Sequence, residues 1–316
     1  MLQNIALSII GLIMLAKCAD LFVDSSASFA RNFNVSTTVI GLTIVSFGTS
    51  APELAISFNA HLSGNTDMLF GNVIGSSISN VLVILGLTVL IKPFKIKPDV
   101  IRKQIPILVL TTIGFSILLL DTLLTNATYN GLSRADGMIL LLIFSIFIYY
   151  LITIIRCDKE MLPLIPPKYK LSKSILLIVL GLGGILIGSH LVVENVEAIA
   201  TSIGVSQKII SITVISIGTS LPELVTTVVA AKKGENEIAI GNIVGANIFN
   251  ICVVLGMPVL VIGEAVAVSF GVFDVLFMIF SVVMLWITSA TGRMIKRAEA
   301  VVFLVTYAGY LVYVLM

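Results

Sequence analysis

The sequence has little charge. Asp, Glu, Lys and Arg make up 11% of its 316 residues, whereas hydrophobic residues make up 58%. A soluble globular domain carries charge on about a quarter of its residues, so this composition excludes an ordinary soluble protein. The apolar runs are continuous and lack the alternation of a membrane β-barrel, so α-helices must satisfy the backbone hydrogen bonds in lipid. We therefore expect an all-α protein that crosses a membrane several times.

Cysteine and histidine are also scarce. The three cysteines, Cys18, Cys157 and Cys252, are scattered, which excludes a disulfide framework and the spacing of a zinc site. The two histidines, His61 and His190, lie in no recognisable catalytic motif. An intramembrane protease would need a nucleophile with a base, or paired catalytic aspartates. We therefore expect a protein that is not an enzyme and that uses no cofactor.

Long apolar segments occupy most of the chain. Since a span needs about 17 to 25 apolar residues, the sequence predicts ten transmembrane helices, at residues 3–24, 36–60, 67–91, 104–122, 133–155, 172–198, 206–231, 237–261, 267–289 and 299–315. The connection at 156–173 is the longest and most polar, and it divides the chain into halves at 1–155 and 174–316. No basic residue precedes the first apolar run, so we expect a retained helix there and not a cleaved signal.

Basic residues gather on one side of the predicted topology. Sixteen of the nineteen Lys and Arg residues fall in alternate connections, whereas only Arg134 and Lys208 fall on the other side and Lys17 lies in the first helix. Basic loops stay in the cytoplasm. We therefore expect a multi-pass protein of the cell membrane with both termini outside and the linker 156–173 in the cytoplasm.

Two blocks of sequence recur 170 positions apart. Residues 39–54 and 209–224 share nine identities in sixteen, and residues 71–80 resemble residues 241–250 without any insertion between the blocks. Each half holds five predicted helices, an odd number, so the second half must enter the membrane from the opposite side. The sequence thus predicts two inverted five-helix repeats, an architecture in which secondary transporters bind substrate between the repeats near the midplane.

The first block reads Gly-Thr-Ser-x-Pro-Glu, at 48–53 and again at 218–223. Pro52 lacks an N–H and its ring collides with the carbonyl of Gly48, so we expect the helix to break there and to free carbonyl oxygens near Ser46 and Gly48. Glu53 and Glu223 would lie deep in apolar segments, where an ionisable group is costly and usually functional. Together with the Thr and Ser hydroxyls they predict a cage of hard oxygens with two negative charges.

Such a cage suits Ca²⁺ or Na⁺ and does not suit Zn²⁺, because no Cys or His joins it. Two ionised carboxylates are strongly unfavourable in a low dielectric unless cations or protons neutralise them. Each of these ions can replace another, and this is the physical basis of exchange. The second block adds amides and hydroxyls as ligands or as partners for broken backbone, and its glycines at 71, 75, 241 and 245 present a small face for close helix packing.

At these residues the chain resembles the prokaryotic sodium/calcium exchangers of the calcium/cation antiporter superfamily, over all ten helices. The resemblance implies a secondary active antiporter that exchanges Ca²⁺ for Na⁺ by alternating access, with a first helix in each half that slides past the core. It implies that the protein works as a monomer in the lipid bilayer and binds Ca²⁺ and Na⁺ but no nucleic acid. It also assigns Ca²⁺ to Thr49, Glu53, Thr219 and Glu223, Na⁺ to Ser46, Ser50, Ser76, Asn80, Ser216 and Ser220, and weak or supporting contacts to Asn72, Asn242 and Asn250.

Two positions depart from the family pattern. The family often has an acidic residue where this chain has Asn250, and a serine where it has Ala246. The neutral Asn250 leaves a charge that one Ca²⁺ balances, but Ala246 removes a hydroxyl from an expected Na⁺ site and leaves the coupling ion open. The alternative is a Ca²⁺ antiporter coupled to H⁺ or another monovalent cation, because carboxylates also exchange protons. A cation channel is disfavoured, because channels assemble around an axis along the membrane normal.

Overall fold

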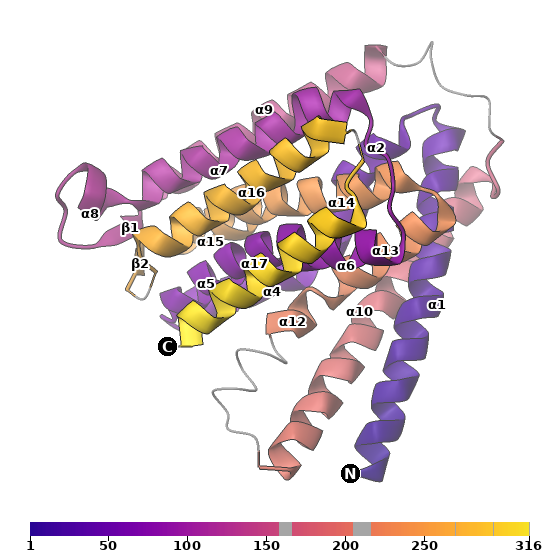
Figure 1. The fold of residues 1–316 in the computed structure, drawn as a ribbon, viewed down its shortest axis with the longest axis horizontal. Coiled ribbons are helices and arrows are strands. Elements are labelled where there is room, and N and C mark those ends of the chain that lie inside the picture. Colours follow the sequence, from indigo (N-terminus) through magenta and orange to yellow (C-terminus); the bar gives the residue numbers. More distant parts are fainter. Residues whose placement is uncertain (158–165, 205–215, 269, 293, 316) are drawn as a thin grey trace.

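The protein is a bundle of helices with one two-stranded sheet, and the computed structural model describes residues 1–157, 166–204, 216–268, 270–292 and 294–315 (Figure 1). The helices of the first half are α1 (Leu2–Asn32), α2 (Thr37–Ile40), α3 (Ser46–Thr49), α4 (Ala51–Leu62), α5 (Thr66–Ser79), α6 (Leu85–Ile91), α7 (Ile105–Leu119), α8 (Asp121–Leu124) and α9 (Arg134–Cys157). Those of the second half are α10 (Leu171–Ser202), α12 (Ser216–Thr219), α13 (Leu221–Lys233), α14 (Asn236–Phe249), α15 (Gly256–Ile262), α16 (Val272–Gly292) and α17 (Arg297–Leu315). Wider, π-helical turns join several of them, at Gly41–Val45, Asn80–Ile84, Val100–Gln104 and Asn250–Leu255.

The helices confirm the expected class of fold. Among the described residues, eight are long and apolar enough to cross a membrane, and the pair Thr37–Thr49 and Ala51–Leu62 forms a ninth span that is bent by 45°. The expected span at 206–231 begins outside the described residues, so the number ten stays a prediction. The first helix of each half is longer than expected, at 31 and 32 residues, because α1 and α10 continue past their apolar segments into polar ends.

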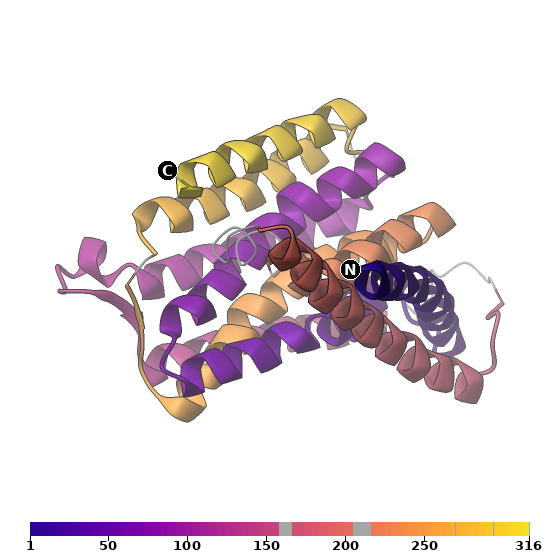
Figure 2. The ribbon, with the colours of Figure 1, turned by 90° about the horizontal axis from the view of Figure 1, so that it is seen from below.

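Helices α1 and α10 lie side by side, at an angle to the other helices (Figures 1 and 2). Glycines allow this close approach. A Cβ on Gly11 would lie 2.9 Å from the Gly188 carbonyl oxygen, and one on Gly181 would lie 2.9 Å from the Cβ of Phe22. Gly11 and Gly181 occupy matched positions in the repeat, so each helix of the pair meets the other through an equivalent small residue.

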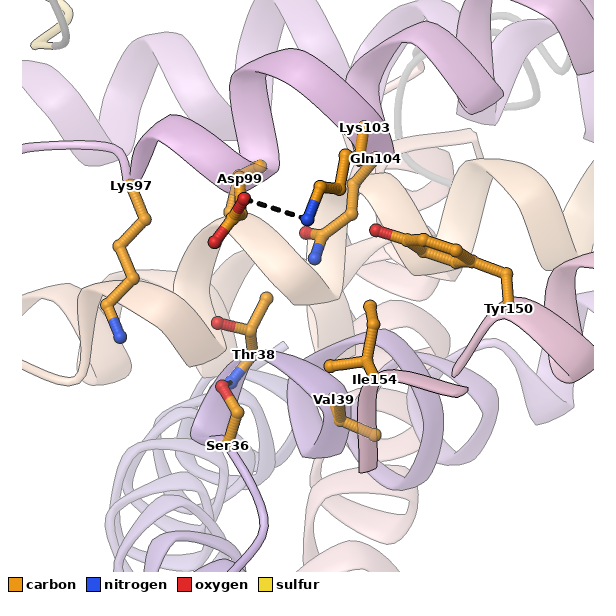
Figure 3. A pocket seen from close by; sticks show the side chains of 10 residues that line it. Ser36, Thr38, Val39, Lys97, Asp99, Lys103, Gln104, Tyr150 and Ile154 are labelled. Carbon is orange, nitrogen blue, oxygen red and sulfur yellow. Dashed lines mark hydrogen bonds and ion pairs between the residues drawn. The ribbon is translucent and has the colours of Figure 1, made fainter. Parts of the chain in front are cut away.

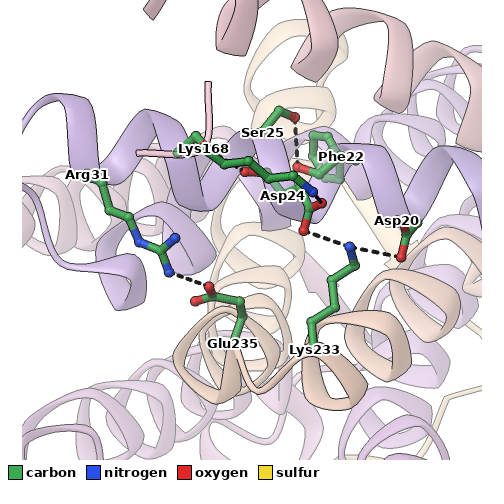
Figure 4. Close-up of polar contacts among 9 residues, drawn as sticks. Asp20, Phe22, Asp24, Ser25, Arg31, Lys168, Lys233 and Glu235 are labelled. Carbon is green, nitrogen blue, oxygen red and sulfur yellow. Dashed lines mark hydrogen bonds and ion pairs between the residues drawn. The ribbon is translucent and has the colours of Figure 1, made fainter. Parts of the chain in front are cut away.

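Basic connections meet at one end of the bundle, which we call the basic end. Arg31 pairs with Glu235 at 2.5 Å, and Lys233 contacts Asp24 at 2.6 Å (Figure 4). Lys168, in the connection before α10, also binds Asp24, and this hydrogen bond raises the pKa of the Lys168 ammonium above its ordinary value. These contacts tie the end of α1 to the end of α13 and to the connection between the halves.

The opposite end is closed by a small sheet that the sequence analysis did not foresee. Strand β1 (Asn130–Leu132) pairs antiparallel with β2 (Ala265–Ala267), and Thr66 Oγ1 donates to the Val266 carbonyl at 2.6 Å. The connection between α4 and α5 therefore lies at this end, whereas its counterpart between α13 and α14 lies at the basic end. The two halves consequently cross the bundle in opposite directions, as inverted repeats require.

Candidate cation site

Two matched helix breaks form the centre of the site. Helix α3 ends at Thr49 and α4 begins at Ala51, and the backbone of Ser50 between them has φ −86° and ψ 8°. Ser220 separates α12 from α13 with φ −91° and ψ 6°. Each break comes two residues before a proline, as Pro52 predicted. The Ser46 carbonyl still accepts the Ser50 N–H at 3.0 Å, so the expected release of this carbonyl is wrong: the bend keeps its helical hydrogen bond.

A pair of asparagines fixes the backbone beyond each break. Asn72 Nδ2 donates to the Glu53 carbonyl at 3.0 Å and to Ser57 Oγ at 2.9 Å. In the other half, Asn242 Nδ2 donates to the Glu223 carbonyl at 3.4 Å and to Thr227 Oγ1 at 3.0 Å. The matched asparagines thus make the same bonds in both repeats. Each one orients the turn from which the glutamate side chain projects.

Hydrogen bonds between the repeats join the two breaks. Thr49 Oγ1 lies 3.2 Å from Asn242 Oδ1, and Ser50 Oγ donates to Glu223 Oε1 at 3.0 Å. Both bonds run from the first break to residues of the second half. The structure therefore brings Thr49, Ser50, Glu223 and Asn242 into one buried cluster.

The two carboxylates are buried and incompletely satisfied. Glu53 and Glu223 are each 1% exposed, and Ser50, three residues before Glu53, hydrogen-bonds Glu223 across the two halves. Among the described residues, both oxygens of Glu53 and Oε2 of Glu223 have no hydrogen-bond partner. A buried carboxylate without partners is strongly unfavourable, whereas a bound cation would balance both charges. The two carboxylates thus provide the negative charge that a cation site needs.

The second block supplies amides from both halves. Asn80 Nδ2 donates to Asn247 Oδ1 at 2.8 Å, and Asn247 Nδ2 donates to the Ser77 carbonyl at 3.2 Å. Asn250 Nδ2 donates to Ser76 Oγ at 3.2 Å. Within the part of the chain that the structure describes, the amide oxygens of Asn80 and Asn250 have no partner. Asn80 and Asn250 therefore each use the amide N–H group for the protein and leave the amide oxygen for a ligand.

Two features of this block escaped the sequence analysis. A π-helical turn starts at Asn80 and another at Asn250, in matched positions, and such turns are frequent at functional sites. No sequence pattern that we used distinguishes a π-helical turn from an α-helical one. Asn247, whose amide crosses from one repeat to the other, was grouped with the other amides and given no role of its own.

The remaining expected residues fall into three groups. Ser46 and Ser220 are buried beside the breaks, and among the described residues Ser220 Oγ has no partner. Thr219 lines a cavity, described below. The side chain of Ser216 lies outside the described residues. Ala246 is fully buried in α14. Its side chain carries no oxygen, so it offers no side-chain ligand to the site.

The glycines of the second block have different surroundings in the two halves. A Cβ on Gly241 would lie 2.9 Å from the Thr38 carbonyl oxygen, and one on Gly245 would lie 2.7 Å from that of Leu42. This confirms close packing for the second half. Gly71 and Gly75 instead line a cavity of about 470 Å³ that also reaches Asn72, Ser76 and Thr219.

The cavity connects the site with the end of the bundle opposite the basic end. Its outer lining includes Asn65 and Met68 at the start of α5, and Leu311 and Val314 near the end of α17. Among the described residues no group of three or more His, Cys, Asp or Glu side chains lies close together. The site is thus two carboxylates among hydroxyl and amide oxygens, a set typical of hard cations.

Comparisons with known proteins agree with this geometry. A family model described as sodium/calcium exchanger protein matches residues 3–153 and 173–316. The putative antiporter CaxA of Alkalimonas amylolytica is 35% identical over 315 residues, covering 96% of this chain and 95% of the relative. The sodium/calcium exchanger MaX1 of Methanosarcina acetivorans is 32% identical over 344 residues, covering 98% and 97%. A solved structure of the sodium-calcium exchanger NCX_Mj superposes with a TM-score of 0.83 at 29% identity, over 98% of both chains.

Proposed function

The chain belongs to the sodium/calcium exchanger protein family, and on that premise we propose that it exchanges Ca²⁺ for Na⁺ across the cell membrane by alternating access. The buried carboxylate pair carries this proposal. Glu53 and Glu223 come from different halves, and three of their four oxygens have no partner among the described residues. One Ca²⁺ between them would neutralise both charges, and monovalent cations or protons would have to take its place when it leaves.

We assign Ca²⁺ to the two carboxylates with the hydroxyls of Thr49 and Thr219. The Na⁺ sites would lie around this centre, at Ser46, Ser50, Ser76, Asn80, Ser216 and Ser220. Asn250 offers an amide oxygen on the same side as Ser76, since the two side chains share a hydrogen bond. Asn72 and Asn242 act on the glutamates through the backbone and support the site without contacting the ion.

The main experiment measures ⁴⁵Ca²⁺ uptake into proteoliposomes under Na⁺, Li⁺, K⁺ or H⁺ gradients in turn. We expect uptake to follow the Na⁺ gradient and to fall to background in Glu53→Gln and in Glu223→Gln, because each change removes half of the site's charge. Glu235→Gln is the matched control, since this carboxylate pairs with Arg31 at the basic end. Uptake that persists unchanged in both site variants would reject the proposal.

Proton coupling is the rival function, and Ala246 favours it. A hydroxyl is missing there from the group expected to hold Na⁺, whereas two buried carboxylates can carry protons without further ligands. Under this rival, uptake follows a pH gradient and is indifferent to Na⁺. The same set of gradients therefore decides between the two coupling ions.

The contacts of α10 with both helix breaks support alternating access. Helix α10 contacts both of them: Leu182 lies against Gly48, Val193 lies against Gly218, and Ser189 Oγ donates to the Gly218 carbonyl at 3.1 Å. We propose that the pair α1 and α10 slides past the remaining helices to close one entrance and open the other. A bifunctional thiol reagent joining Asp24→Cys to Lys233→Cys should abolish exchange. Full activity of the cross-linked protein would reject sliding.

The basic end gives the orientation that we propose. Basic loops remain in the cytoplasm, so the cavity that reaches Thr219 would open outward, and both termini would lie outside. Labelling of Arg102→Cys in intact and permeabilised cells tests this. A membrane-impermeant thiol reagent should modify this cysteine only after permeabilisation, and modification in intact cells would reverse the assignment.

A further inference from the structure

A small polar pocket lies at the basic end, away from the cation site. It has a volume of about 170 Å³ between the start of α2, the π-helical turn at Val100–Gln104, and α9 (Figure 3). Its polar lining includes Thr38, Lys103 and Gln104. None of these residues belongs to the carboxylate cluster or has a task in the exchange proposed above.

The pocket contains a lysine in a solvent-exposed ion pair and a buried amide whose oxygen has no partner among the described residues. Lys103 Nζ contacts Asp99 at 3.0 Å, but these side chains are 56% and 69% exposed, and such surface pairs contribute little. Gln104 is only 3% exposed and its Oε1 has no partner among the described residues. Figure 3 shows the Lys103 and Gln104 side chains projecting into the same space. Together they offer an ammonium donor for an oxyanion and an amide that can bind a hydroxyl group.

An apolar groove adjoins this pocket. It has a volume of about 390 Å³ and is lined by Phe29, Phe33, Ile148 and Ile152. Val39 lines both the pocket and the groove. Helix α9 also lines both the pocket and the groove, since Ile154 lines the pocket and the adjacent Ile155 lines the groove. One elongated molecule with a polar head and an apolar tail can therefore occupy the two spaces at once.

We propose that this paired site binds an anionic phospholipid. Its phosphate would contact Lys103, a headgroup hydroxyl would contact Gln104, and an acyl chain would follow the groove. Charge supports this occupant, because the connection at 92–103 carries five of the chain's basic residues, and basic clusters at a membrane surface attract anionic lipids. The adjoining groove favours a ligand with an apolar tail over a purely soluble anion, which would leave the groove unused.

The position of the site suggests what the lipid does. Ser36 Oγ accepts the Thr38 N–H at 3.2 Å and caps α2, the first turn of the broken span that leads to Glu53. Thr38 Oγ1 also donates to Glu237 at 2.7 Å, which ties this turn to the start of α14. A lipid seated over Thr38 would therefore brace α2, which leads to the break before Glu53, and the start of α14, which carries Asn242.

Native mass spectrometry of the purified full chain tests the proposal with phosphatidylglycerol and phosphatidylcholine. We expect retention of phosphatidylglycerol over phosphatidylcholine, and a loss of about five-fold in Lys103→Gln, the effect expected for one basic residue near a lipid surface. Arg102→Gln is the matched control, because it removes the same charge from the adjacent position outside the pocket lining.

A second pair of variants tests the groove. Ile152→Trp places a large ring in the groove and should reduce phosphatidylglycerol retention at least as much as Lys103→Gln does. Leu142→Trp adds the same ring to an exposed position elsewhere on α9 and should leave retention unchanged. Equal loss in Lys103→Gln and Arg102→Gln would show general surface attraction and overturn the site. Displacement of the lipid by inorganic phosphate alone, or no effect of Ile152→Trp, would overturn the role of the acyl chain.

Discussion

The two halves share a framework but differ in what they place on it. Asn72 and Asn242 hold the carbonyl of a glutamate in the same way, nineteen residues apart in each case. The blocks that follow differ: α5 offers the hydroxyls of Ser76 and Ser77, whereas α14 has Ala246 and Asn247 at the matched positions. The two repeats therefore share the backbone geometry beyond the breaks and differ in the polar side chains of the helices that follow.

This difference assigns separate tasks to the two walls. Helix α14 packs tightly on the first half through Gly241 and Gly245, and Asn247 bonds across the interface. Helix α5 lines the open cavity through Gly71 and Gly75. The α14 wall thus packs against the first half, whereas the α5 wall lines the cavity.

Removing the shared framework should have the largest effect. In Asn242→Ala the Glu223 carbonyl loses its amide donor and the Thr49 hydroxyl loses an acceptor across the interface. The substitution removes three hydrogen bonds of the Asn242 amide, each worth about 0.5–1.5 kcal/mol, so we expect ⁴⁵Ca²⁺ uptake to fall about ten-fold or more. Asn72→Ala should reduce uptake as well, because the Glu53 carbonyl loses its amide donor.

The control is Ser57→Ala, which removes the other acceptor of Asn72 and leaves the bond to Glu53 in place. It should retain most of the uptake. If Asn72→Ala and Asn242→Ala both behaved like the wild-type protein, the two asparagines would not support the site.

Because α14 packs against the first half, a substitution in its interface should have a smaller effect than Asn242→Ala, and the effect should be on stability. Asn247→Ser copies the first-half residue Ser77 and removes two hydrogen bonds between the repeats. We expect the free energy of unfolding to fall by about 1–3 kcal/mol, measured by thermal unfolding in detergent. Ser77→Ala is the control at the matched position of α5, and because Ser77 Oγ has no partner among the described residues, it should change stability by no more than about 0.5 kcal/mol. Equal losses in the two variants would contradict the division between the walls.

The sequence predicted the parts of this comparison that depend on residue type and repetition. Pro52 and its counterpart located both breaks, and the loop charges located the basic end. Three features depended on spatial context instead. The π-helical turns at Asn80 and Asn250 have no local residue signature, the pairing of β1 with β2 joins connections 135 residues apart, and the task of Asn247 follows only from the neighbour that its amide meets.

The smallest effect, and the one that bears on the coupling ion, is expected from restoring the missing hydroxyl. Ser76 Oγ donates to the Asn72 carbonyl one turn earlier at 2.5 Å. Ala246→Ser can make the same bond to the Asn242 carbonyl, so the added hydroxyl need not be buried without a partner. If Na⁺ binds between the walls, one further oxygen of this kind contributes about 0.5–1 kcal/mol.

The Na⁺ concentration that half-activates ⁴⁵Ca²⁺ exchange should accordingly fall about two- to five-fold in Ala246→Ser, since 1.4 kcal/mol corresponds to a factor of about ten. Ser76→Ala removes the hydroxyl from the other wall and should raise this concentration by a similar factor. A proton-coupled exchanger would respond to neither change in its Na⁺ dependence. Opposite shifts in the two variants would therefore place Na⁺ between α5 and α14, whereas a shift in Ser76→Ala alone would place it on the α5 wall.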